Sequence, residues 1–147
     1  MTHLKTYKIK QVAQISGVSV RTLHYYDEIG LLVPSDRTKA GYRLYDENDL
    51  LRLQQVLIGR SLGLALEEIR LSLDEESFDY ANTLKKQRAL LVARLCQTHK
   101  MIAAVDSTLT SLGEANAEID FKIIFDGFDP AEFEDEASHR WGNTDEY

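Results

Sequence analysis

The stretch VAQISGVSVRTLHYYDEIGLLVP, residues 12–34, contains two short helical patterns separated by a glycine. Ala13 is small enough to lie where one helix crosses another, and Gly17 allows the positive φ that a tight interhelical turn requires. The Ser19 side chain can cap the second helix by accepting a backbone N–H. Leu23 then lies on the inner face of that helix. This spacing predicts a helix–turn–helix, and two unrelated short helices joined by a glycine turn are the alternative.

The outward face of the second helix carries planar side chains that form hydrogen bonds, rather than the flexible Lys and Glu of a solvated helix. Helical spacing places Leu23 and Tyr26 on the inner stripe. The opposite stripe consists of Arg21, His24, Tyr25 and Glu28. Arginine can bond guanine edges in a DNA major groove, and His and Tyr can reach phosphate oxygens. The face therefore predicts contact with double-stranded DNA.

A basic and aromatic segment follows, SDRTKAGYRLYDENDL at residues 35–50, and it is typical of strand, turn and strand around Gly41. Its basic and aromatic side chains are Arg37, Lys39, Tyr42, Arg43 and Tyr45. A short basic hairpin beside such a helix predicts the wing of a winged helix, which contacts the DNA backbone. The alternative is a solvated loop whose tyrosines pack against the domain.

Two further helical patterns complete the first half of the chain. Asp46 is placed to cap a third helix, and residues 66–73 form a fourth apolar pattern. The apolar stripe of the third helix is Leu50, Leu53, Val56 and Leu57. Arg52, between these positions, is predicted to be a solvated helix residue.

No glycine or proline occurs between Tyr80 and Leu112, and apolar residues recur there with coiled-coil spacing. The heptad a positions are Arg88, Leu95, Ile102 and Leu109, and the d positions are Leu84, Leu91, Thr98, Val105 and Leu112. A charge at an a position is costly to bury, so this seam is expected to fray at Arg88. A single helix cannot bury such a stripe, which predicts a homodimer. Packing against the acidic tail, residues 113–147, is the alternative.

The formal net charge of −7 is unevenly distributed along the chain. Residues 1–60 contain nine basic and six acidic side chains, whereas residues 113–147 contain two basic and eleven acidic ones. Charges are screened over about 8 Å at physiological ionic strength, so the acidic end does not exclude a polyanion partner for the basic end. The asymmetry indicates two parts with different roles.

The composition predicts a cytoplasmic protein that is not an enzyme. The N-terminal MTHLKTYKIK lacks the apolar core of a signal peptide, and no run of about 18 apolar residues predicts a membrane span. The lone Cys96 excludes an intramolecular disulfide framework. Cys96 and His99 are too few ligands for a metal site, so we expect no metal and no cofactor. No nucleophile–base pair or phosphate-binding loop is visible.

Taken together in order, these motifs resemble a known family. SGVSVRTLHYYDEIGLL and GYRLYDENDLLRLQQVLIGRSLGLALEEIR, at residues 16–32 and 41–70, resemble the N-terminal domain of MerR-family transcription regulators. The resemblance covers about residues 7–76 and continues into the long helix. DFKIIFDGFDPAEFEDEASHRWGNTDEY, residues 120–147, resembles the start of a TipA-type effector-binding domain.

The resemblance implies a mainly α fold: a winged helix–turn–helix with a small β wing, followed by a long coiled-coil dimerisation helix. The implied domains are a DNA-binding domain at 7–76, a dimerisation helix at 80–112, and a linker with the incomplete start of an effector-binding domain at 113–147. Some 25 to 35 residues of that domain, including Trp141, cannot enclose a ligand pocket. We therefore expect a truncated or a naturally short form.

The resemblance also implies which residues contact DNA. They are Ser19, Arg21, Thr22, His24, Tyr25, Arg37, Lys39, Tyr42 and Arg43. The position of His24 often holds Arg in the family, so its phosphate contact is expected to be weaker or sensitive to pH.

The function implied is promoter activation by DNA distortion. Family members bind promoters as dimers and realign promoter elements separated by an over-long spacer, so that RNA polymerase can use them. The phenylalanines and Trp141 of the acidic tail suggest an organic effector rather than a metal ion. An architectural or excisionase-like DNA-binding protein without effector control is the alternative.

Overall fold

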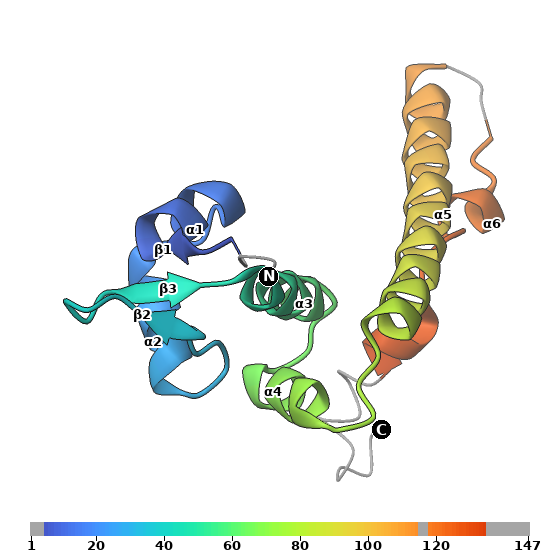
Figure 1. Ribbon diagram of the computed structural model, residues 1–147. Helices are drawn as coiled ribbons and strands as arrows, with labels where there is room; N and C mark the ends of the chain where they lie inside the picture. Colours follow the sequence, from blue (N-terminus) through green and yellow to red (C-terminus); the bar gives the residue numbers. More distant parts are fainter. Residues whose placement is uncertain (1–4, 115–117, 135–147) are drawn as a thin grey trace, which may run out of the picture. The chain divides into compact units, whose positions relative to one another are not determined.

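The computed structural model describes residues 5–114 and 118–134 (Figure 1). It divides into two compact units, Met1–Thr83 and Leu84–Tyr147. Helices predominate in both, and the first unit also contains a three-stranded sheet in the order β1-β3-β2. Within the described ranges, every helix lacks an apolar stretch of the length that a membrane span requires.

The helix–turn–helix is formed by α1 (Ile9–Ser16) and α2 (Val20–Glu28). Gly17 ends α1 with φ 79°, in the left-handed region that glycine adopts without a Cβ clash. Ser19 caps α2, because its hydroxyl oxygen accepts the N–H of Thr22 at 3.1 Å. Both local predictions, the turn at Gly17 and the cap at Ser19, are confirmed.

The wing is an antiparallel hairpin of β2 (Asp36–Arg37) and β3 (Arg43–Tyr45). Gly41 has φ 88° in the connecting turn. The turn is closed by two backbone hydrogen bonds, from Thr38 N–H to Tyr42 O at 2.8 Å and from Gly41 N–H to Thr38 O at 2.9 Å. The predicted strand–turn–strand is therefore confirmed.

The sequence did not predict the third strand, β1 (Tyr7–Lys8), which pairs antiparallel with the free edge of β3. Tyr7 lies opposite Tyr45, far along the chain. Two residues are too short to show the alternation by which a strand is recognised. Only tertiary pairing creates this strand, and it leads directly into α1.

Side chains at the start of α3 (Glu47–Ser61) cap this helix and connect it to the residue before the wing. Asp46 accepts the N–H of Asp49 at 2.8 Å, and Asp49 accepts the N–H of Asp46 at 2.9 Å, so the two form a capping box. Asp49 is buried, with 8% of its surface exposed, and it also accepts the backbone N–H and the hydroxyl of Ser35. Asp46 is confirmed as a cap, and Asp49 connects the start of the wing to α3.

The fourth predicted helix is α4 (Leu66–Asp74), which packs on α3. A Cβ added to Gly59 of α3 would lie 2.8 Å from Cδ1 of Ile69. Ile69 is buried in this contact. The absence of a side chain at Gly59 is therefore what allows the two helices to approach so closely.

One hydrophobic core holds the first unit together, with contributions from its helices, the loop after α2, and β3. Its buried members are Val12, Leu23, Tyr26, Leu31, Leu32, Tyr45, Leu53, Val56 and Ile69. The predicted inward position of Tyr26 is confirmed, as is the predicted stripe of α3, with Leu53 and Val56 buried and Leu50 and Leu57 packed against them.

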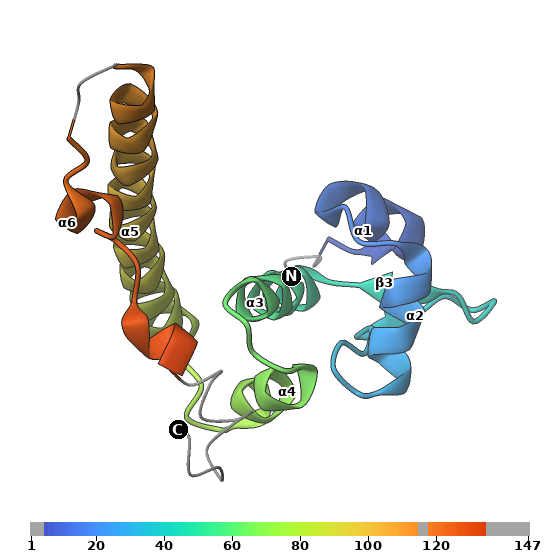
Figure 2. The same cartoon turned by 180° about the vertical axis from the view of Figure 1, so that it is seen from behind.

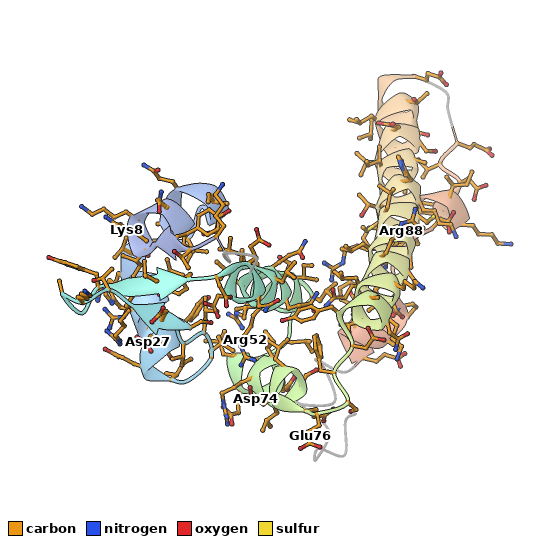
Figure 3. The ribbon with its side chains drawn as sticks, in the orientation of Figure 1. Lys8, Asp27, Arg52, Asp74, Glu76 and Arg88 are labelled. Carbon is orange, nitrogen blue, oxygen red and sulfur yellow. The ribbon has the colours of Figure 1, made fainter. Side chains whose placement is uncertain are left out.

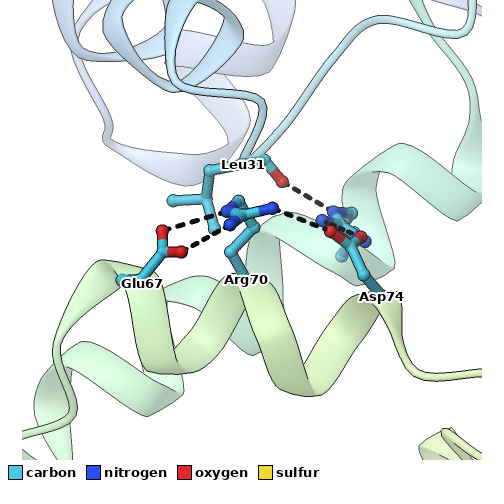
Figure 4. Close-up of polar contacts among 5 residues, drawn as sticks. Leu31, Glu67, Arg70 and Asp74 are labelled. Atoms are coloured by element: carbon cyan, nitrogen blue, oxygen red, sulfur yellow. Dashed lines mark hydrogen bonds and ion pairs between the residues drawn. The ribbon is translucent and has the colours of Figure 1, made fainter.

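Arg52 is not the solvated residue that the sequence predicted. Its Nε donates a hydrogen bond to the carbonyl oxygen of Leu31 at 2.6 Å, and its Nη2 lies 2.9 Å from Oδ1 of Asp74 (Figure 4). Arg70 contacts the same Asp74 and pairs with Glu67. Arg52 therefore links the loop after α2 to α3 and α4.

The second unit is built on α5, the helix Tyr80–Gly113, which continues across the boundary from the first unit. A segment containing α6 (Phe121–Ile124) runs back beside it in both views (Figures 1 and 2). We call residues 118–134 the docked segment. Trp141 lies outside the described residues.

The position of the docked segment shows how far the tail covers the coiled-coil seam, which was the alternative to a homodimer. From residue 88 to the end of α5, the partly or fully buried positions are Gln97, Met101, Ala104, Ser107, Thr108 and Ser111. The large apolar seam residues Leu91, Leu95, Ile102, Val105, Leu109 and Leu112 remain exposed. The docked segment thus covers a flank of α5 and leaves the seam open.

Candidate nucleic-acid interface

The outward face of α2 is arranged as the helical wheel predicted. Arg21 and Tyr25 are exposed and His24 is partly exposed, whereas Leu23 and Tyr26 are buried. The core below α2 fixes the rotation of the helix, because turning it would expose these two inner residues. The face is therefore held rigidly toward the surface, and its contact with DNA stays a prediction.

At the start of α2, Ser19 and Thr22 are joined by their side chains. The hydroxyl of Ser19 donates to Oγ1 of Thr22 at 2.9 Å, in addition to accepting the Thr22 N–H. These residues lie at a helix N-terminus, where backbone N–H groups and the helix dipole favour an anion such as a phosphate. The predicted contact of Ser19 and Thr22 with DNA is thus compatible with the cap that Ser19 forms on α2.

The wing arginines are tied to α2 by Asp27, a residue that the sequence did not single out. Nε of Arg43 lies 2.8 Å from Oδ2 of Asp27, and Nη2 of Arg37 lies 3.8 Å from the same oxygen. The side chains of Asp27 and Arg43 are only 15% and 28% exposed. A phosphate contact by Arg43 stays a prediction, and it would use the guanidinium nitrogens other than Nε.

Arg37 also stiffens the wing itself. Its Nη1 donates to the carbonyl oxygen of Gly41 at 3.2 Å, across the hairpin turn. At the tip, Lys39 is exposed and the Tyr42 side chain points to solvent, with the residue 70% exposed. Both predicted tip residues are therefore accessible to a ligand without rearrangement of the hairpin.

A hollow of about 730 Å³ lies between the start of α1, the face of α2 and the wing. Its lining residues are Lys8, Ile9, Lys10, Gln11, Val20, His24, Gly41, Tyr42 and Arg43. The lining contains three basic side chains and the imidazole of His24, and none of its side chains is acidic. The hollow brings His24, Tyr42 and Arg43 together, as expected for one binding surface.

Lys8 and Lys10 are site residues that the sequence reading missed. They enter the hollow because β1 pairs with β3 and places the start of α1 next to the wing (Figure 3). The signal was present in the alternating lysines of YKIKQ, residues 7–11. It could not be used without knowing that this stretch lies beside the wing.

Among the described residues, no group of three or more His, Cys, Asp or Glu side chains could hold a metal ion. Cys96 is an exposed free cysteine. The hydrogen-bonding and positively charged side chains of the candidate site lie on α2, the wing and the start of α1.

Comparisons with known proteins agree with this arrangement. The sequence model of a family described as MerR HTH family regulatory protein matches residues 7–76. The HTH-type transcriptional activator TipA of Streptomyces coelicolor is 47% identical over 145 residues, covering 97% of this chain and 57% of TipA. The HTH-type transcriptional activator mta of Bacillus subtilis is 49% identical over 106 residues, 72% of this chain and 41% of mta.

A solved structure is also similar over most of the chain. The crystal structure of the HTH-type transcriptional regulator SkgA from Caulobacter crescentus matches with a TM-score of 0.84 and 43% identity. The match covers 94% of this chain and 99% of that one. This chain spans about half the length of the curated relatives it matches. The winged helix–turn–helix followed by a long helix is therefore the fold of known relatives.

Proposed function

The chain belongs to the MerR family of HTH regulatory proteins, and we propose that it regulates transcription by binding double-stranded promoter DNA. The observation that carries the proposal is the surface shared by α2, the wing and the start of α1. It presents Arg21, His24 and Tyr25 from a helix that the core holds in place. Lys8 and Tyr42 extend the same surface to either side.

The roles of these residues follow from the chemistry of a DNA duplex. Arg21 reads base edges in the major groove, because a guanidinium can bond guanine O6 and N7 together. His24, Tyr25 and Tyr42 contact phosphates beside the groove, and Lys8, Lys10 and Lys39 add positive charge along the backbone. Phosphate contacts position the protein, whereas Arg21 supplies sequence preference.

A second chain is the proposed partner of the exposed α5 seam. A stripe of six large apolar residues on one face of a long helix has little stability in water unless another surface covers it. A homodimer would present two α2 helices at a fixed spacing, which suits half-sites roughly 34 Å apart on the same side of the duplex. The operator is therefore expected to be palindromic.

The dimer is proposed to activate transcription by bending or untwisting the operator. A rigid pair of α2 helices imposes its own spacing on DNA, and deforming a site of this size costs on the order of a few kcal/mol, offset by the added contacts. RNA polymerase is the proposed partner on the realigned promoter, and the cytoplasm the proposed location. TipA and mta are both named transcriptional activators, which supports regulation rather than catalysis.

Genomic selection of bound DNA, followed by footprinting and in-vitro transcription at the recovered site, tests the proposal. Protection of a palindrome between promoter elements, with activation that disappears when the spacer is shortened to standard length, is the expected result. Protection of scattered sites without an effect on transcription would instead favour an architectural protein.

Two substitutions test the assigned roles. Arg21→Ala is expected to relax base preference, with a loss of about 1–3 kcal/mol at the preferred site. Lys8→Ala is expected to weaken all sites alike and to reduce the slope of log affinity against log salt by about one. Lys86→Ala, which removes a charge from an outward position of α5, serves as the control. Unchanged binding by both test variants would refute the proposed surface.

A further inference from the structure

The docked segment is held against α5 by a close backbone contact at Gly127. A Cβ at this position would lie 2.8 Å from Cβ of Lys100, 3.0 Å from the carbonyl oxygen of Gln97 and 3.0 Å from the backbone N of Met101. Gly127 also has φ 91°, which other residues rarely adopt. Glycine is therefore required here for two independent reasons, and it fixes where the segment lies on α5.

This docking site is next to the coiled-coil seam. In the heptad frame, Gln97 and Ala104 occupy c positions, and Met101 and Thr108 occupy g positions. Ala104 has 2% of its surface exposed. Because a coiled-coil seam of a and d residues is flanked by e on one side and g on the other, the docked segment borders the g edge of the seam.

A hollow of about 220 Å³ connects the docked segment with the seam. From α5 it is lined by Ala104, Val105, Thr108 and Leu109, and from the docked segment by Ile124 and Phe128. Val105 and Leu109 are themselves d and a residues of the seam. The apolar surface is therefore continuous from the seam, across the hollow, to the docked segment.

We propose that the docked segment is part of the dimer interface, with Ile124 and Phe128 packing against α5 of a second copy of the chain. This inference rests on the proposed dimer. A partner helix seated on the seam covers Val105 and Leu109, and it therefore also faces the hollow that these residues share with Ile124 and Phe128. The flanking g edge of a two-helix coiled coil always faces the partner, whichever way the partner runs.

The exposure of the segment agrees with this occupant. Phe128 is 44% exposed although it lines the hollow, so a substantial part of its ring remains available for a further contact. Aromatic side chains at the edge of a seam contribute large apolar area, which dimer interfaces favour. The docked segment would thus widen a two-helix contact on each side.

Sedimentation of the full chain over a range of concentrations tests the inference. Phe128→Ser is expected to raise the dimer dissociation constant by about tenfold or more, since two copies of the side chain leave the interface. Phe121→Ser is the matched control, because Phe121 is an exposed phenylalanine of the same segment that does not line the hollow. Equal dissociation constants for the two variants would overturn the inference and leave the dimer standing.

Gly127→Ala provides a second variant that leaves the apolar side chains in place. Its methyl group collides with α5, so the segment is expected to undock and the dimer to weaken as with Phe128→Ser. Gly113→Ala is the control, since nothing lies within 4 Å of a Cβ there. A dimer unaffected by Gly127→Ala would overturn the inference. A wild-type chain that stays monomeric throughout would instead refute the dimer itself, and with it the proposed function.

A photo-cross-linking side chain, p-benzoylphenylalanine in place of Phe128, identifies the contact directly. Mixed dimers of isotope-labelled and unlabelled chains distinguish cross-links between chains from those within one chain. Cross-links between chains that map to α5 are the expected result. Cross-links found only within single chains, in a sample that sediments as a dimer, would contradict the inference.

Discussion

The two units of the molecule bury their apolar side chains in different ways. The first unit encloses nine buried core residues within its own chain. In the described part of the second unit, Ala104 is the one buried residue of α5, and the apolar stripe beside it is exposed. The first unit therefore carries its stability within itself, whereas the second leaves exposed an apolar stripe that the proposed dimer would cover.

A charge placed in the α5 seam should give the largest difference between the two units, because it disrupts the dimer and leaves the first unit folded. Ile102→Asp would bury two carboxylates without partners in a dimer. An uncompensated buried charge costs about 3–5 kcal/mol, so the dimer should dissociate. Sedimentation should show monomers, and DNA binding should be lost, while the first unit keeps its circular dichroism. Ala103→Asp, at an exposed outward position, is the control. A dimer that survives Ile102→Asp would show that the seam lies elsewhere.

Truncation of a core residue in the first unit should lower the free energy of unfolding much more than truncation of a seam residue in the second. Leu53 is 2% exposed, so Leu53→Ala leaves a cavity and should lower the free energy of unfolding by about 2–5 kcal/mol. Leu95→Ala, measured at a concentration where the chain is monomeric, should change it by less than about 0.5 kcal/mol, because Leu95 is exposed. Denaturant unfolding measures both. Similar losses for the two variants would contradict the contrast between the units.

The ion pair between the wing and α2 is a smaller, more local contribution. Asp27→Asn weakens the contact with Arg43 and Arg37 and should lower the free energy of unfolding by about 1 kcal/mol, since the carboxylate is mostly buried. Glu28→Gln, an exposed neighbour on α2, should have almost no effect. If the Asp27 variant is as stable as the Glu28 variant, the wing is held by packing alone.

The buried hydroxyl of Tyr45 predicts an effect of similar size and of opposite sign. It has no hydrogen-bond partner among the described residues, so Tyr45→Phe should raise the free energy of unfolding by about 1 kcal/mol. Tyr42→Phe, at an exposed position, should leave stability unchanged. A loss of stability in Tyr45→Phe would show that the hydroxyl has a partner.

The pH dependence of the same residue gives a second readout. Burial, together with the nearby charge of Asp27, raises the pKa of Tyr45 above its ordinary value of 10.0. The stability that comes from keeping the phenol protonated in the folded state is thus fully present below pH 10.0. It is lost as the pH rises through the raised pKa of the folded protein. Tyr45→Phe should lose less stability than the wild type in alkaline unfolding curves.

Several features of the candidate site were predictable because they depend on local chemistry. The turn at Gly17, the cap at Ser19 and the inward rotation of Tyr26 each follow from spacing within one or two helical turns. The wing followed from a glycine turn between short apolar and basic runs. The contacts of Asp27 with Arg43 and of Arg52 with Leu31 were not predictable, because the partners lie 16 and 21 residues apart in the chain.

By itself, the sequence determined helices α1 to α5, the caps at Ser19 and Asp46, the turns at Gly17 and Gly41 and the apolar stripe of α5, since each depends on neighbouring residues and on the period of the helix. Only the tertiary structure decided that Lys8 lies beside the wing, that Asp27 engages Arg43, and that Gly127 docks on a flank of α5. These contacts join segments whose separation in space is set by the packing of whole elements. A local pattern carries no information about that separation.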